Sequence, residues 1–70
     1  MATTVFFEEV LTDKSSKELT MELEVGRSSA YGENHLYLRV DETTVILDEK
    51  VGRSLCEAFE SVGHYLSYTG

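Results

Sequence analysis

Residues 48–66, DEKVGRSLCEAFESVGHYL, are the one stretch in which apolar residues recur with the period of a helix through several turns. Its apolar positions, three or four residues apart, form a single stripe: Val51, Leu55, Ala58, Phe59, Val62 and Leu66. Asp48 suits the N-cap position, because its carboxylate can accept hydrogen bonds from the free N–H groups of the first turn. Gly63 is compatible with a helix that ends at Val62, but Leu66 continues the stripe, so we expect the helix to run to about Leu66. A stripe of this kind has to be covered by another part of the fold.

The chain before this helix contains four runs in which apolar and polar residues alternate, as they do in half-buried strands. These runs are residues 3–11, 18–25, 35–40 and 43–47. They are separated by a polar turn at 12–17, a glycine- and serine-rich loop at 26–34, and the pair Asp41 and Glu42. We therefore predict an α+β fold, a four-stranded antiparallel meander sheet with one C-terminal amphipathic helix packed on one face. The 70 residues are expected to form a single domain, residues 1–70, near the lower size limit for a fold held by a core alone.

The alternation divides the strand residues between the two faces of the sheet. The face toward the helix is expected to supply the core: Val5, Phe7, Leu11, Leu19, Met21, Leu23, Val25, Leu36, Leu38, Val40, Val45 and Leu47. The opposite face is expected to present four apolar residues, Phe6, Val10, Tyr37 and Ile46, inside a charged rim of Glu8, Glu22, Glu24 and Arg39. Such a composition suits a homodimer interface or a partner-binding face. The alternative is that these are separate exposed apolar residues, which are common on protein surfaces.

The chain is strongly acidic, with thirteen Asp and Glu residues against six Lys and Arg and a formal charge of −7. This balance opposes phosphate binding, so we expect a basic protein surface as partner and no direct nucleic-acid ligand. The acidic partner-binding surface is expected to comprise Glu8, Glu22, Glu24, Asp41 and Glu42. One alternative is that the carboxylates imitate a phosphate backbone and block a DNA- or RNA-binding protein. Another is that the charge only keeps the protein in solution.

The loop at 26–34 carries two residues of the types that anchor protein interfaces, Arg27 and Tyr31. Loops held by a rigid sheet are common places for recognition, so these two residues are predicted to contact a partner. The loop does not have the Gly-Lys-Ser/Thr ending of a phosphate-binding P-loop.

The residue types that carry catalysis or bind metals are few and badly spaced. Cys56 and His64 lie eight residues apart on the predicted helix, about 12 Å along its axis, which is too far for a nucleophile and its base. His35 has no second histidine or cysteine at the spacing of a zinc site. We therefore predict no catalytic residues, no metal and no cofactor. With one cysteine, and no apolar run typical of a secretory signal or a membrane span, a cytoplasmic location is expected.

These observations favour a small, acidic, non-enzymatic protein-binding module that forms a homodimer and regulates or inhibits a partner by occupying its surface. In size, acidity and layout the chain is similar to the small inhibitors that phages make against host proteins, which implies a phage or prophage origin and a place in the host cytoplasm. The alternatives are a structural or assembly subunit, and a small hydrolase or transferase that uses Cys56 or a histidine.

Overall fold

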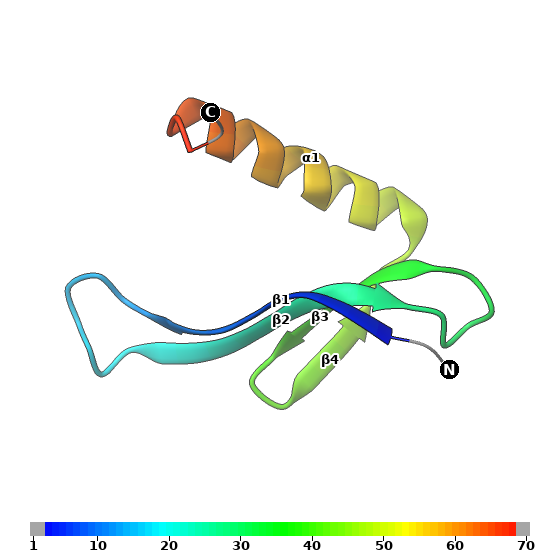
Figure 1. Ribbon diagram of the computed structural model, residues 1–70, viewed down its shortest axis with the longest axis horizontal. Coiled ribbons are helices and arrows are strands. Elements are labelled where there is room, and N and C mark those ends of the chain that lie inside the picture. The colour runs from blue at the N-terminus through cyan, green and yellow to red at the C-terminus, as the bar shows by residue number, and fades with distance from the viewer. Residues whose placement is uncertain (1–2, 69–70) are drawn as a thin grey trace.

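The computed structural model describes residues 3–68 as a four-stranded sheet followed by one helix (Figure 1). The strands are β1 (Thr3–Thr12), β2 (Thr20–Ser28), β3 (His35–Val40) and β4 (Thr43–Ile46), and the helix is α1 (Glu49–Tyr65). The sheet order is β1-β2-β3-β4, and every neighbouring pair is antiparallel. The predicted α+β meander with a C-terminal helix is confirmed.

The connections form for local chemical reasons. In the turn between β1 and β2, the Asp13 carboxylate accepts from the N–H groups of Ser15 and Ser16 at 2.9 and 3.0 Å. These two bonds stabilise the charged carboxylate and hold the pKa of Asp13 below its usual value. In the tight turn between β3 and β4, Asp41 adopts a positive φ of 53°, a conformation that aspartate tolerates better than most residues.

β1 contains one extra residue relative to β2. Val5 is opposite Gly26 and Phe7 is opposite Val25, so Phe6 has no partner and forms a β-bulge. The bulge reverses the expected faces of Val5 and of Phe6 itself. Val5 lies on the side of the sheet that faces away from α1, with Gly26 and Tyr37, whereas Phe6 lines a hollow on the helix side with Leu36. The predicted placement of Val5 in the core and of Phe6 on the opposite face was therefore wrong.

Helix α1 begins as the sequence predicts. The Asp48 carboxylate accepts from the Val51 N–H at 2.8 Å, and Glu49 forms an ion pair with Arg53 one turn later. The helix continues through Gly63 and ends at Tyr65, where Leu66 is the C-cap, which confirms the predicted continuation.

The helix contacts the sheet mainly through β3 and near its own first turns. Gly52 is buried against Leu36, and beyond it the helix diverges from the long β1–β2 hairpin (Figure 1). The expected burial of the helical stripe does not occur within one chain, because Val51, Phe59, Val62 and Leu66 are all exposed. The predicted core is likewise incomplete: among the described residues no large side chain is fully buried, and Tyr37 is the one buried hydrophobic residue.

Candidate functional site

The acidic residues expected at a partner-binding surface gather around one cation, Arg39. On the side of the sheet away from α1, its guanidinium lies 3.3 Å from Glu24, 3.5 Å from Glu22 and 3.9 Å from Glu8. We call this side of the sheet the outer face; it comprises Val5, Glu8, Val10, Glu22, Glu24, Tyr37, Arg39, Thr44 and Ile46. Glu8 and Glu22 are well exposed, whereas the Glu24 side chain is only 16% exposed.

Strand register explains why these charges meet. Glu8 is directly opposite Glu24, and Glu24 is directly opposite Arg39, so the three side chains form a row across β1, β2 and β3. Two carboxylates in directly opposite positions repel each other, and a guanidinium beside them offsets that repulsion. The sequence predicted that each residue faces outward, but the row depends on register between strands.

Glu24 is held from its other side by Tyr37. The Tyr37 hydroxyl donates a hydrogen bond to the Glu24 carboxylate, and Tyr37 is 4% exposed. This hydrogen bond, helped by Arg39, holds the pKa of Glu24 below its usual value. The same bond, together with burial, raises the pKa of Tyr37 to about 12. Glu24 and Glu22 raise the pKa of Arg39, chiefly through the hydrogen bond between Arg39 and Glu24. Glu24 therefore stays ionised and fixed in position.

The turn between β3 and β4 extends the acidic surface. The Glu22 N–H donates to the Asp41 carboxylate at 3.0 Å, and the Asp41 N–H donates to the Glu22 carbonyl at 2.9 Å. Arg39 also donates to the Asp41 carbonyl. Glu22, Arg39, Asp41 and Glu42 line one open hollow at this end of the outer face. The structure thus brings together the five predicted acidic residues, and it adds Arg39, which the sequence placed only in a charged rim.

The predicted apolar patch on the outer face is not continuous. Tyr37 pairs with Ile46, but the charged row that contains Glu24 and Arg39 separates them from Val10, which is opposite Glu22. Tyr37 is buried under its neighbours, and Phe6 points to the helix side because of the bulge. Of the four residues predicted as a dimer or partner face, Val10 and Ile46 remain available on this side, on opposite sides of a charged row.

The two residues predicted in one loop do not act together, because β2 runs to Ser28: Arg27 lies within β2, which corrects the prediction, and only Tyr31 lies in the loop that follows. Arg27 donates to the Asn34 side chain at 2.9 Å and to the Thr4 hydroxyl at 2.6 Å, so it braces the loop against β1. It is opposite Leu36 and therefore lies on the helix side of the sheet, away from the acidic residues. Tyr31 is 75% exposed in the loop. The predicted partner contacts of Arg27 and Tyr31 remain untested, but these residues do not belong to the outer face.

The described residues contain no group of three or more His, Cys, Asp and Glu side chains arranged to hold a metal ion. Cys56 is exposed on α1, and His64 lies eight residues later in the same helix. Within residues 3–68, no helix has the length and apolar character needed to cross a membrane.

Comparison with known proteins adds no family. No protein-family model matches the chain, and searches of the curated proteins and of the solved structures found no significant match. The functional argument therefore depends on the geometry of the outer face and on the surfaces that the fold leaves uncovered.

Proposed function

We propose that the protein is a non-enzymatic binding module that regulates or inhibits a protein partner by placing the outer face on a basic surface of that partner. The observation that carries the proposal is the concentration of Glu8, Glu22, Glu24, Asp41 and Glu42 around a single guanidinium. Arg39 neutralises only part of this charge, so the surface stays negative. Because Glu24 is held by Tyr37 and Arg39, part of the negative surface is already ordered before a partner arrives.

Strict mimicry of nucleic acid is a narrower form of the same proposal. A nucleic-acid backbone has only exchangeable counterions beside its phosphates, whereas Arg39 is a fixed cation within this carboxylate cluster. The general form, binding of a basic protein surface, is therefore the one we propose. The identity of a captured partner distinguishes the two forms.

The test is an affinity capture with matched charge variants. The tagged protein, immobilised, is exposed to a cell lysate at low and at high salt, and the captured proteins are identified by mass spectrometry. The outer-face variant is Glu8→Gln with Glu22→Gln, since both side chains are exposed and neither carries the Tyr37 bond. The control variant is Glu57→Gln with Glu60→Gln, which removes the same charge from exposed positions on α1.

A basic protein should be captured by the natural sequence and by the α1 control, and should be lost with the outer-face variant and at high salt, because screening weakens attraction between exposed charges. Capture of the same proteins by the outer-face variant would show that the outer face is not the binding surface. Capture that does not respond to salt would show that charge does not drive binding.

A further inference from the structure

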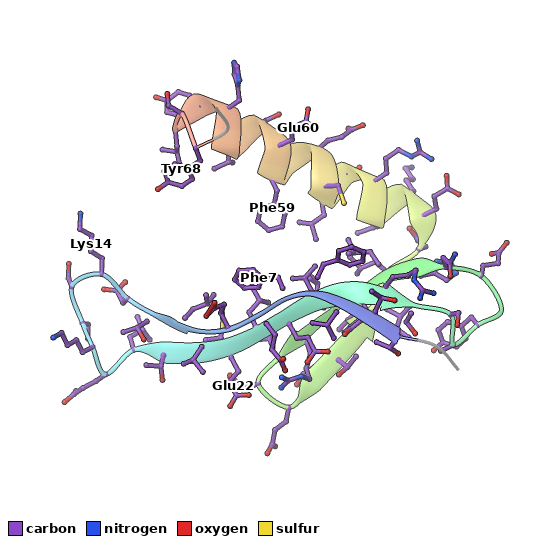
Figure 2. The ribbon with its side chains drawn as sticks, in the orientation of Figure 1. Phe7, Lys14, Glu22, Phe59, Glu60 and Tyr68 are labelled. Carbon is purple, nitrogen blue, oxygen red and sulfur yellow. The ribbon has the colours of Figure 1, made fainter. Side chains whose placement is uncertain are left out.

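A large apolar surface is uncovered on the opposite side of the sheet from the acidic residues. Phe59 points from α1 toward the sheet, and Phe7 points from β1 toward the helix, while Glu60 points away (Figure 2). We call this the open apolar side; its exposed large residues include Phe6, Phe7, Met21, Phe59, Val62 and Leu66. Phe6 and Phe59 are 76% and 62% exposed. Aromatic side chains normally supply core or interface area, so leaving them in water is unfavourable.

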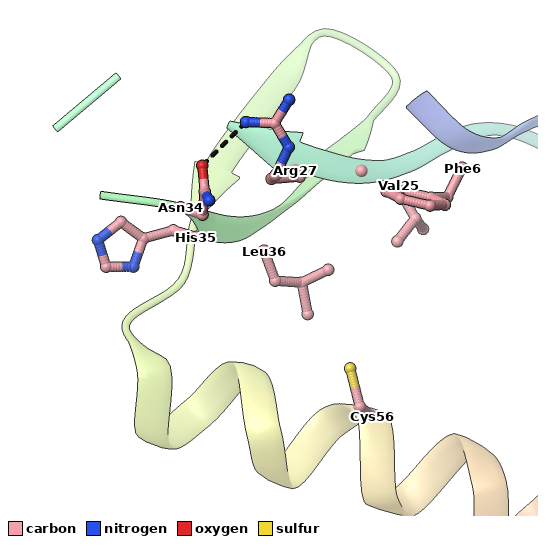
Figure 3. Close-up of a pocket in the computed structure, with 8 residues that line it drawn as sticks. Phe6, Val25, Arg27, Asn34, His35, Leu36 and Cys56 are labelled. Atoms are coloured by element: carbon pink, nitrogen blue, oxygen red, sulfur yellow. Dashed lines mark hydrogen bonds between the residues drawn. The ribbon is translucent and has the colours of Figure 1, made fainter. Parts of the chain in front are cut away.

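On the open apolar side, a hollow of about 420 Å³ lies between α1 and the sheet. Leu36 from β3 and Cys56 from α1 extend into it, and the Arg27–Asn34 hydrogen bond lies at its rim (Figure 3). Phe6 and Val25 line it from β1 and β2, so its wall is almost entirely apolar. Cys56 of α1 and the hairpin residues Phe6 and Val25 therefore line one hollow that this chain does not fill.

The surface area of the chain indicates how much is uncovered. Folded monomers of 7.9 kDa expose about 4,400 Å² by the usual scaling with mass, whereas this chain exposes 5863 Å². The difference is about 1,450 Å² per chain. Obligate homodimers bury roughly 1,000–2,500 Å² from each partner, so the excess has the size of a homodimer interface.

From this agreement we infer that a second copy of the chain covers the open apolar side. The α1 stripe of each copy lies on the β1–β2 hairpin of the other, and a two-fold axis makes the two contacts identical. The lengths are compatible, since α1 with 17 residues spans about 26 Å and β1 with 10 residues about 33 Å. A second copy is also the partner that is always present at synthesis, which a chain with so little buried core requires.

This inference does not rest on the proposed function, because the two surfaces are on opposite sides of the sheet. Their responses to salt also differ. Each copy carries a charge of −7, so added salt screens the repulsion between two copies and strengthens the dimer. Salt weakens the contact of the outer face with a basic partner. Failure of one proposal therefore leaves the other to be judged separately.

The test compares Phe59→Ser with Val10→Ser by light scattering. Both side chains are 62% exposed in the single chain, but Phe59 belongs to the open apolar side and Val10 to the outer face. The natural sequence and Val10→Ser should have a mass of twice 7.9 kDa. Phe59→Ser should weaken the dimer roughly 1,000-fold, because a symmetric dimer loses two anchors at about 30-fold each.

A natural sequence that is monomeric at about 100 μM, or that forms a larger assembly, overturns the inference. Dissociation caused by Val10→Ser, or a dimer dissociation constant that Phe59→Ser does not raise, also overturns it. If Phe59→Ser does not fold, thermal unfolding of the natural sequence decides the question, since the midpoint temperature of an obligate dimer rises with protein concentration. A midpoint that does not depend on concentration contradicts the inference.

Discussion

At the scale of single residues, Tyr37 is the side chain on which the outer face depends most. Its ring covers Gly26, and its hydroxyl holds Glu24, which in turn is opposite Glu8 and Arg39. A buried phenol that donates to a carboxylate is favoured in its neutral form. Removing the hydroxyl therefore affects both the stability of the sheet and the order of the acidic cluster.

The raised pKa of Tyr37 predicts a loss of stability at high pH. An unfolded tyrosine releases its proton near pH 10, whereas folded Tyr37 keeps it until about pH 12, so the folded state binds more protons between these values. The free energy of unfolding should be unaffected by this group below pH 10 and should fall as the pH rises from 10 to 12. Urea denaturation followed by circular dichroism at several pH values measures this slope.

Two substitutions test whether Tyr37 causes this dependence of stability on pH. Tyr37→Phe should lower stability at neutral pH, because Glu24 loses its hydrogen bond, and should reduce the slope above pH 10 by up to one proton. Tyr31→Phe, at a position 75% exposed, is the control and should leave the slope unchanged. An equal slope in Tyr37→Phe and the natural sequence would contradict the role given to this hydroxyl.

At the scale of secondary-structure elements, two glycines mark the closest approaches of the chain to itself. Gly26 in β2 lies beneath the Tyr37 ring, and a Cβ there would be 2.3 Å from the Thr4 carbonyl oxygen and 2.7 Å from the ring. Gly52 in α1 lies against Leu36, but a Cβ there would be 3.4 Å away, an ordinary contact. The first site has no room for a side chain, whereas the second has.

Alanine at these two positions should therefore have opposite effects. Gly26→Ala should destabilise the fold by about 1–3 kcal/mol, since the nearest atom belongs to the backbone and cannot move aside. Gly52→Ala should stabilise it by up to about 1 kcal/mol, because alanine is favoured over glycine within a helix. Urea denaturation at one fixed protein concentration measures both. A neutral Gly26→Ala would contradict the close packing of β1, β2 and Tyr37.

At the scale of the whole molecule, the single chain is more extended than its length requires. Its radius of gyration is 13.7 Å, compared with about 11 Å for a compact domain of 70 residues. The helix and the β1–β2 hairpin account for this difference, because they diverge from a common contact at β3 (Figure 1). A second copy that packs between α1 and the hairpin doubles the mass but adds little to the radius of gyration.

Small-angle X-ray scattering should therefore give a radius of gyration of about 14 Å for a particle of twice 7.9 kDa, the value for a compact assembly of 140 residues. The mass doubles while the radius changes little. Dimerisation through the outer faces would leave both open apolar sides uncovered, and the radius would be clearly larger than that of one chain. That result would contradict the arrangement inferred for the two copies.

The placement of Phe6 and Arg39 shows where prediction from sequence ended. The alternation in β2 and β3 correctly predicted the faces of Glu22, Glu24 and Arg39, because a strand side chain changes face at every residue. The same rule placed Phe6 on the wrong face, since one extra residue in β1 shifts the alternation and leaves no signal in composition. Contacts between Arg39 and three carboxylates depend on register, which local patterns do not specify.

By itself, the sequence determined the elements of this protein, from the Asp48 cap to the four alternating runs, because periodicity, turns and caps depend on residues close together in the chain. Only the tertiary structure decided which of these elements cover one another. The sequence required a cover for the stripe on α1, but the helix diverges from the sheet after Gly52 and leaves the stripe exposed. Burial depends on the angle between elements, and that angle is decided by contacts between residues far apart in the chain.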